Sequence, residues 1–182
     1  ISGTNYSDLD SIFKRVFQML ILFAESAHKD IFGDEKEDLE SLKARDIEVN
    51  KFCLYLQRAI NKMSYPDAIN GRIIFAYSVL LEKIGDEIER AWRTNVKYKI
   101  KKTKEIKELF EMTQECLGKA FDGYFQFNSK IIQEIYPIRD KIREKSVLFR
   151  KIDPQTIRFI RHIVKIAEDS ADLNHLNLMK NL

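Results

Sequence analysis

The chain has few of the residues that interrupt regular structure, since its 182 residues include only six Gly and three Pro. Few turns are therefore available, and the regular elements must be long. Its two cysteines, Cys53 and Cys116, lie in apolar helical contexts without a Cys-x-x-Cys motif, which predicts buried free thiols in a reducing cytoplasm. The longest apolar run, from Val16 to Ala24, is interrupted by Gln18 and is too short to cross a bilayer. We expect a cytoplasmic protein that does not insert into membranes.

The chain also lacks the local motifs of common catalytic and nucleotide-binding sites. It has no Gly-rich phosphate loop, no nucleophile elbow and no Cys/His spacing for zinc. Its net charge of +3 is too small for a dedicated nucleic-acid-binding domain. Glu25 and His28 are spaced as in di-iron bundles, but such a core needs two of these motifs and two more glutamates, and the chain has three histidines in all. We predict that the chain is not an enzyme and does not contact nucleic acid directly.

What the chain does contain is helical periodicity along its whole length. Hydrophobic residues make up 45% of it and charged residues 32%, which is typical of amphipathic helices with solvated outer faces. Apolar residues recur at helical spacing, and we find no convincing alternating strand. The pattern predicts six helices. Five of them cover about residues 7–31, 37–62, 67–95, 129–149 and 153–176. The fourth in order begins within the basic stretch 97–107 and ends at about residue 127.

The order of these helices indicates an internal repeat. The second predicted helix has an apolar seam that recurs every seven residues, which is typical of a bundle, at Leu42, Val49, Leu56 and Met63. Pro66 and Pro154 are suited to open the third and sixth helices, because proline is favoured at the first helical position. Each set of three helices thus closes with a proline-started helix. We predict an all-α six-helix bundle made of two three-helix repeats, residues 1–97 and 98–182.

An acidic motif stands late in the third predicted helix, in the sequence LEKIGDEIER of residues 81–90. Glu82 and Asp86 are four residues apart, so they lie on one face of a helix, one turn from each other. Two such carboxylates can bind a cation jointly. At 100° per residue, these two side chains and Glu89 lie roughly opposite Ile84 and Ile88. We therefore expect an acidic patch outside the bundle, and we predict that it binds metal.

A related motif returns near the C-terminus. Glu168, Asp172 and His175 fall within about 60° of one another on the sixth predicted helix. Carboxylate and imidazole on one ridge suit a transition metal better than Ca²⁺. The alternative is a polar flank of a helix near its end. We name these three residues as a second candidate metal site.

The charge of the chain is unevenly distributed. Residues 1–95 contain 13 Lys or Arg against 16 Asp or Glu, a net charge of −3, and residues 96–182 contain 18 against 12, a net charge of +6. A basic set on the fifth predicted helix includes Arg139, Arg143 and Lys145. Complementary charge raises the rate and specificity of association. We predict that these three residues bind the acidic face of a partner.

These motifs resemble the PhoU family of phosphate-uptake regulators. The resemblance rests on RDIEVNKF at residues 45–52, LEKIGD at 81–86 and KIAE at 165–168, in this order and at this spacing. The first of them is closest to archaeal members, some of which carry an N-terminal DNA-binding domain. The second repeat departs from the family pattern. Val164 stands in place of the first acid if Lys165 is aligned with Lys83, and Glu168 pairs with Asp172 if the acids are aligned instead.

The resemblance implies a function. It predicts a cytoplasmic regulator of phosphate uptake and signalling that binds a phosphate transporter or an associated signalling protein, with a divalent or ferric ion (Fe, Zn, Mn or Ni) on its acidic motifs. Asp46 and Glu48 are additional candidate ligands for the site at Glu82 and Asp86, and we expect a homodimer. The alternative is the sensing and dimerisation domain of a transcription regulator whose DNA-binding segment is absent from this chain.

Overall fold

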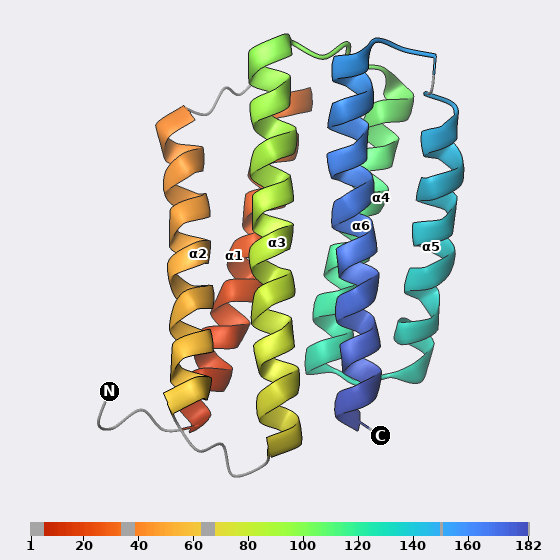
Figure 1. Ribbon diagram of the computed structural model, residues 1–182. Helices are drawn as coiled ribbons and strands as arrows, with labels where there is room; N and C mark the ends of the chain where they lie inside the picture. The colour runs from red at the N-terminus through yellow and green to blue at the C-terminus, as the bar shows by residue number, and fades with distance from the viewer. Residues whose placement is uncertain (1–5, 34–38, 63–67, 150, 182) are drawn as a thin grey trace.

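The computed structural model describes residues 6–33, 39–62, 68–149 and 151–181. Within these residues the chain is all-α, with no strand, and forms six helices (Figure 1). They are α1 (Tyr6–Phe32), α2 (Leu39–Lys62), α3 (Ala68–Tyr98), α4 (Lys104–Phe125), α5 (Ser129–Val147) and α6 (Pro154–Asn181). The predicted fold class is confirmed. Met63 and Pro66, which entered that prediction, lie outside the described residues.

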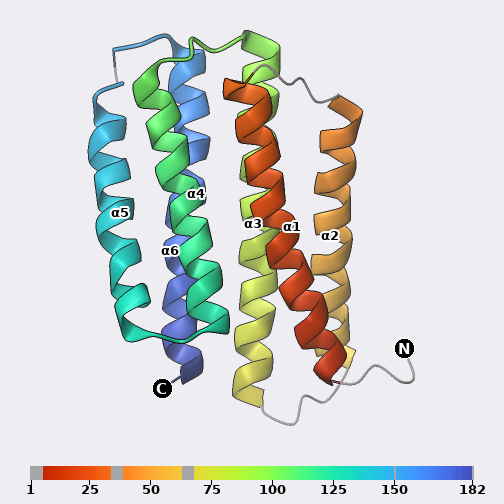
Figure 2. The same cartoon turned by 180° about the vertical axis from the view of Figure 1, so that it is seen from behind.

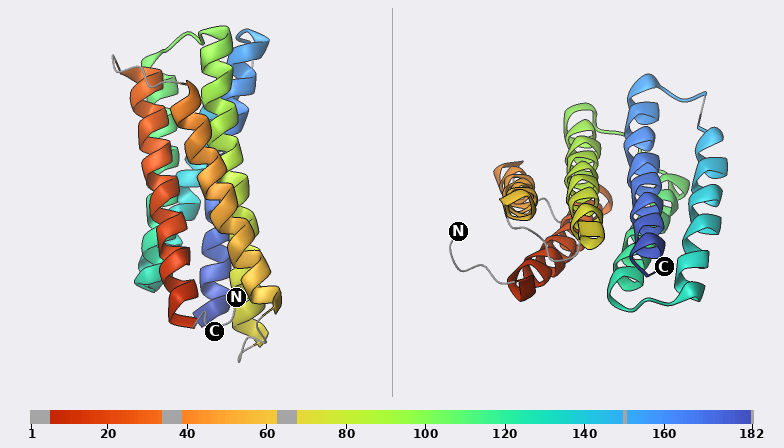
Figure 3. Two further views of the ribbon diagram at one scale, coloured as in Figure 1. Left: turned by 90° about the vertical axis from the view of Figure 1, so that its left-hand side faces the viewer. Right: turned by 60° about the horizontal axis from the view of Figure 1, so that its bottom comes forward.

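The six helices form two triplets joined through their inner members. Consecutive helices run antiparallel, and α3 and α6 stand side by side at the centre of the bundle (Figure 1). Behind them, α1 packs against α4 (Figure 2). The two remaining helices lie at opposite edges, with α2 against α1 and α3, and α5 against α4 and α6 (Figure 3). Each triplet therefore has one outer helix, and α2 and α5 occupy corresponding positions.

Side-chain caps determine where the helices of the second triplet begin. Thr103 accepts a hydrogen bond from the backbone N–H of Ile106 at 3.3 Å, so α4 begins inside the basic stretch, as predicted. Asn128 caps α5 through the N–H of Lys130 at 2.9 Å. Asp153 accepts from the N–H of Thr156 at 2.9 Å, and Pro154 is the first residue of α6, as predicted.

The ends of α5 and α6 differ from the prediction. Helix α5 ends at Val147, two residues before the expected position, and α6 continues to Asn181, five residues beyond Leu176. The extension has a tertiary cause, because Asn177 in the last turns is fully buried. Its side chain accepts a hydrogen bond from the hydroxyl of Tyr77 on α3 and donates one to the carbonyl of Ala120 on α4 at 3.2 Å.

The core confirms the predicted seam of α2. Leu42, Val49 and Leu56 are all buried, and both cysteines are buried free thiols. Burial raises the pKa of each thiol to about 12, so neither is poised to react. No helix among the described residues has the length and apolar character needed to span a bilayer.

Gly85 sets how closely α3 approaches its neighbours. A Cβ atom at this position would lie 3.3 Å from both Leu20 Cδ2 of α1 and Val49 Cγ1 of α2. The absence of a side chain therefore lets α1 and α2 pack close to α3 at the middle of the acidic motif. This close approach is what brings the carboxylates of α3 next to a carboxylate of α2.

Candidate functional site

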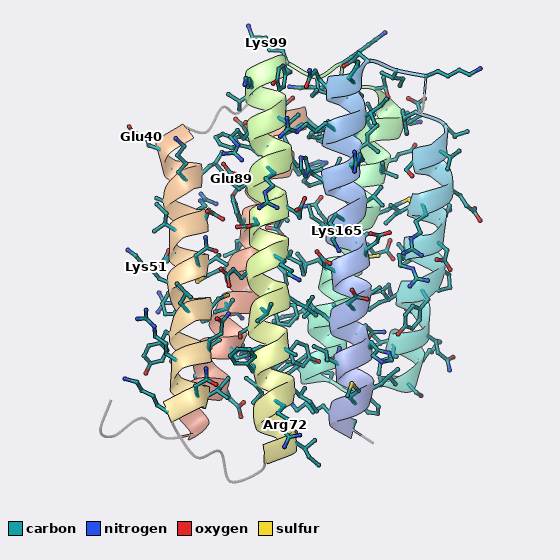
Figure 4. The ribbon with its side chains drawn as sticks, in the orientation of Figure 1. Glu40, Lys51, Arg72, Glu89, Lys99 and Lys165 are labelled. Carbon is teal, nitrogen blue, oxygen red and sulfur yellow. The ribbon has the colours of Figure 1, made fainter. Side chains whose placement is uncertain are left out.

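An acidic cluster lies at the interface of α2 and α3 and consists of Asp46, Asp86 and Glu89. Asp46 comes from α2, and its Oδ1 lies 4.0 Å from the Cβ position of Gly85 on α3. Burial, with the negative charges of Asp86 and Glu89 as further causes, raises the pKa of Asp46 to about 6. Figure 4 shows Glu89 on the side of α3 that faces α2. The structure thus gathers carboxylates from two helices at one place.

Two oxygen atoms of this region are buried without a hydrogen-bond partner among the described residues. They are Asp46 Oδ1 and Asn50 Oδ1, both on α2. The other carboxylate oxygen of Asp46 accepts a hydrogen bond from Asn50 Nδ2 at 3.4 Å. Buried polar atoms are normally paired, so these two oxygens mark a place where a hydrogen-bond donor or a cation would be stabilised.

The prediction that the acidic patch lies outside the bundle is wrong. Glu82, Asp86 and Glu89 are half-buried, and Glu82 accepts a hydrogen bond from Gln57 Nε2 of α2 at 3.2 Å. Helix α2 covers this flank of α3, which the angular positions of the residues on α3 alone could not show. The acids lie away from Ile84 and Ile88, as expected, and next to a neighbouring helix, and the side chain of Asp86 remains 37% exposed.

Arginines on α3 supply part of the compensating charge. Arg90 Nη2 lies 2.8 Å from Asp86 Oδ2, and Arg90 Nη1 lies 2.6 Å from Glu87 Oε1. Arg93 lies 3.3 Å from Glu89. These are i,i+3 and i,i+4 pairs on a helix surface, and they reduce the repulsion within the cluster. A metal ion bound to Asp86 would compete with Arg90 for that carboxylate.

Glu48, predicted as an additional ligand, does not join the cluster. It is exposed on the outer side of α2, where its carboxylate lies 3.8 Å from Arg15 of α1. The chemistry of the remaining donors fits a hard or borderline cation, because carboxylate and amide oxygens are the groups such ions prefer. As the side chains stand, no three His, Cys, Asp or Glu residues of the described chain are arranged to hold a metal ion. Metal binding here stays a prediction.

The second candidate site is dispersed on α6. Glu168 forms an ion pair with Arg143 of α5 at 2.9 Å, whereas Asp172 and His175 are exposed.

The acid that α6 does bury was missed by sequence reasoning. Asp169 is almost fully buried and accepts a hydrogen bond from Lys165 Nζ at 2.5 Å. Burial raises the pKa of Asp169, and the Lys165 ammonium partly opposes this effect. The sequence did contain a sign that Asp169 would be buried, because this residue lies on the apolar stripe of the helix, three residues after Ile166.

A second missed feature joins the two triplets. His162 Nδ1 of α6 lies 2.6 Å from Glu87 Oε2 of α3, and both side chains are largely buried. Glu87 is also the partner of Arg90, so one carboxylate links a helix of each repeat. The two residues are 75 positions apart in the chain, and no local pattern connects them.

Glu25 and His28 do not form a metal motif. Glu25 is exposed, whereas His28 Nε2 lies 3.4 Å from Glu111 of α4, with its ring against Phe32 and Phe110. Burial lowers the pKa of His28, although Glu111 opposes this effect. The geometry is that of a histidine packed between α1 and α4.

The fold of this chain is similar to that of a protein of known structure, although its sequence matches no known family. No protein-family model matches the chain, and no curated protein sequence matches it. Among solved structures, it is similar to the crystal structure of the phosphate transport system regulatory protein PhoU from Streptococcus pneumoniae. The similarity covers 94% of this chain and 92% of that chain, with a TM-score of 0.60 and 13% sequence identity.

The chain has a PhoU-like fold. The likeness in structure spans both three-helix triplets, as the motifs at residues 45–52, 81–86 and 165–168 predicted. At 13% sequence identity, this structural likeness shows the fold alone. It does not show that the chain belongs to the archaeal branch of the family, which the α2 motif suggested. That finer assignment stays a prediction, as does the boundary between the repeats at residues 97 and 98.

In this PhoU-like bundle, the predicted partner-binding residues are engaged within the chain. Arg139 lies 2.8 Å from Asp140, and Lys145 lies 3.0 Å from Glu108 of α4. Arg143 pairs with Glu168 of α6, as described above. All three cations thus already have acidic neighbours on α4, α5 or α6. Their role in docking stays a prediction, and a partner would have to compete with these contacts.

Proposed function

We propose that this chain is a PhoU-like regulator of phosphate uptake and phosphate signalling that acts in the cytoplasm by binding other proteins. The observation that carries the proposal is the likeness of fold, over 94% of this chain and 92% of the other, to a phosphate transport system regulatory protein. The position of the acidic motif supports it, because the charges of Asp46 and Asp86 interact across two helices of one triplet. The partner is a phosphate transporter or an associated signalling protein.

The proposed mechanism is binding and conformational coupling, without turnover of a substrate. The helices of the two triplets are joined by buried polar contacts, such as the one between Glu87 and His162, so a partner that binds one triplet can influence the other. We also propose that the chain forms a homodimer, because a two-fold symmetric dimer is the commonest assembly of soluble oligomeric proteins.

The direct test is phosphate uptake in the source organism. We expect deletion of the gene to raise uptake of labelled phosphate in phosphate-rich medium, because a restraint on the transporter is removed. Expression of the wild-type chain should restore the original rate, and sulfate uptake, as a control, should not change. Unchanged phosphate uptake would contradict the proposal. If transcription changed instead, the alternative of a sensing and dimerisation domain would be favoured.

We further propose that the acidic cluster binds one divalent or ferric ion, with Fe, Zn, Mn and Ni as candidates. Asp46, Asp86 and Glu89 would supply carboxylate oxygens, and Glu82, one turn away, a further one. The bound ion would supply positive charge at Asp46 Oδ1, which has no partner among the described residues. Metal binding at Glu168, Asp172 and His175 is a separate proposal, which would add a second ion per chain.

Metal content measures the first of these proposals. After dialysis against each metal, we expect about one ion per chain in the wild type and a loss of most of it in the Glu82→Ala/Asp86→Ala variant, because the remaining acids leave the coordination incomplete. The matched control is Glu115→Ala/Asp122→Ala, which removes two exposed carboxylates from α4. Equal metal content in the wild type and in Glu82→Ala/Asp86→Ala would refute the site.

A further inference from the structure

A cleft lies where α5 ends and α6 begins, at the end of the bundle shown uppermost in Figure 1. Its volume is about 960 Å³, and Glu87 of α3 reaches its inner wall. Much of the lining is apolar, including Val147 at the end of α5, Phe149 just after this helix, and Ile157 and Val164 from α6. The cleft is separate from the acidic cluster, which lies between α2 and α3.

Exposed apolar side chains lie at the end of α5 and in the connection that follows it, and one of them, Val147, lines the cleft. Val147 is 45% exposed, the adjacent Leu148 is 78% exposed, and Ile152 follows in the same connection. Single exposed apolar residues are common on protein surfaces, whereas a group of them near a hollow is a feature of interaction sites. This surface therefore has the apolar part of a docking groove.

The cleft also carries positive charge that no described residue neutralises. Arg158 and Arg161 line it and are exposed, and neither forms an ion pair or hydrogen bond with any residue that the structure describes. The other charged groups of the lining are satisfied within the chain. Lys165 is paired with Asp169, Glu168 with Arg143, and Glu87 with both Arg90 and His162.

This pattern separates Arg158 and Arg161 from the basic residues of α5. Arg139, Arg143 and Lys145 all have acidic neighbours, so a partner's carboxylate gains little there. At Arg158 and Arg161, an incoming carboxylate would meet guanidinium groups that are not paired with any described residue and that lie beside apolar surface. Arginine is the cation best suited to such pairing, because its planar fork matches a carboxylate.

We propose that this cleft docks an acidic amphipathic helix of a partner protein. Apolar side chains of the partner would contact the wall formed by Val147, Phe149, Ile157 and Val164, and its carboxylates would pair with Arg158 and Arg161. This is the helix-in-groove mode of recognition. The inference rests on the proposed function of binding other proteins and deepens it by assigning a surface and the chemistry of the partner.

The size of the cleft favours a peptide segment over a small anion. A volume of about 960 Å³ lies at the upper end of the range of about 300–1,000 Å³ for ligand pockets. A single phosphate would leave most of the apolar wall in contact with water, whereas an amphipathic helix would cover the wall and the two arginines together.

The test uses the full chain and a defined probe, a fluorescein-labelled helical peptide of Leu, Ala and Glu with Leu on one face and Glu on the other. We expect fluorescence anisotropy to show that it binds the wild type, and that Arg158→Glu/Arg161→Glu weakens binding by about tenfold, because attraction becomes repulsion. Val147→Asp should weaken it as well. A twin peptide with Lys in place of Glu should bind much more weakly.

The matched control is Arg58→Glu/Arg72→Glu, which reverses two exposed arginines that form no ion pair with described residues. Arg72 lies near the opposite end of the bundle from the cleft (Figure 4). At equal ionic strength, this control should bind the acidic peptide within about twofold of the wild type. Circular dichroism checks that each variant is folded, and Arg158→Gln/Arg161→Gln replaces the charge-reversed variant if that one does not fold.

Three results would overturn the inference. One is an equal loss of affinity in both double variants, and another is equal binding of the acidic and basic peptides. The third is displacement of the peptide by millimolar inorganic phosphate at constant ionic strength, which would make the cleft an anion site. If the peptide does not bind but deletion of the gene still alters phosphate uptake, the docking surface is contradicted and the proposed function stands. If the peptide binds specifically but deletion of the gene leaves phosphate uptake unchanged, the docking surface is supported and the proposed function is contradicted.

Discussion

Replacement of Leu56 by alanine is expected to lower the free energy of unfolding by about 2–5 kcal/mol, the range for truncation of a leucine in a packed core. Leu56 lies on α2 and is completely buried, with a relative exposure of 0%. Alanine would lose the transfer free energy of the removed methyl groups and leave a cavity where α2 packs against α1 and α3. Because α2 is an outer helix, the loss also weakens the support of Asp46 in the acidic cluster.

Urea denaturation followed by circular dichroism measures this change. The matched control on the same helix is Leu54→Ala, since Leu54 is 43% exposed, and we expect a change below about 1 kcal/mol there. A loss below about 1 kcal/mol for Leu56→Ala, or an equal loss for both variants, would mean that the inward face of α2 is assigned wrongly.

Replacement of Asn177 by alanine is expected to lower the free energy of unfolding by about 2–4 kcal/mol, because it leaves buried groups on two other helices without partners. One is the hydroxyl of Tyr77 on α3, which donates to Asn177 Oδ1, and the other is the carbonyl of Ala120 on α4, which accepts from Asn177 Nδ2 at 3.2 Å. An unsatisfied buried polar group costs about 1–3 kcal/mol. Asn177 thus connects three helices from both triplets.

A double-mutant cycle isolates the contact between the repeats. Tyr77→Phe removes the hydroxyl alone, and we expect its effect to fall in the Asn177→Ala background, with a coupling energy of about 0.5–3 kcal/mol. Asn61→Ala, which replaces an exposed asparagine in the last turn of α2, is the control and should change stability by less than about 0.5 kcal/mol. Strict additivity of Tyr77→Phe and Asn177→Ala would show that the two side chains do not interact.

Much of the fold was predictable from the sequence because the signals for it are local. The seven-residue seam of α2 placed Leu42, Val49 and Leu56 in the core, where the structure has them. Asp153 and Pro154 marked the start of α6, since a cap needs only the residues of one turn. The end of α6 was not predictable in this way, because its last turns are held by Tyr77 of another helix.

The candidate site was predictable in part. The spacing of Glu82, Asp86 and Glu89 showed that they share one side of α3, which the structure retains. It could not show that α2 covers this side and adds Asp46, because helical angles give the direction of a side chain and not its neighbour. The ridge of Glu168, Asp172 and His175 exists, but Glu168 is engaged by Arg143 of α5.

The sequence by itself determined the number and type of the helices, their order in two triplets and the positions of the acidic motifs. Tertiary structure alone decided which charges are paired and which are free. Glu87 meets His162 from 75 residues away and Arg143 meets Glu168 from 25 residues away, while Arg158 and Arg161 have no partner among the described residues. The physical reason is that contacts between helices depend on the rotation and register of each helix. Packing of the whole core sets both, and local periodicity sets neither.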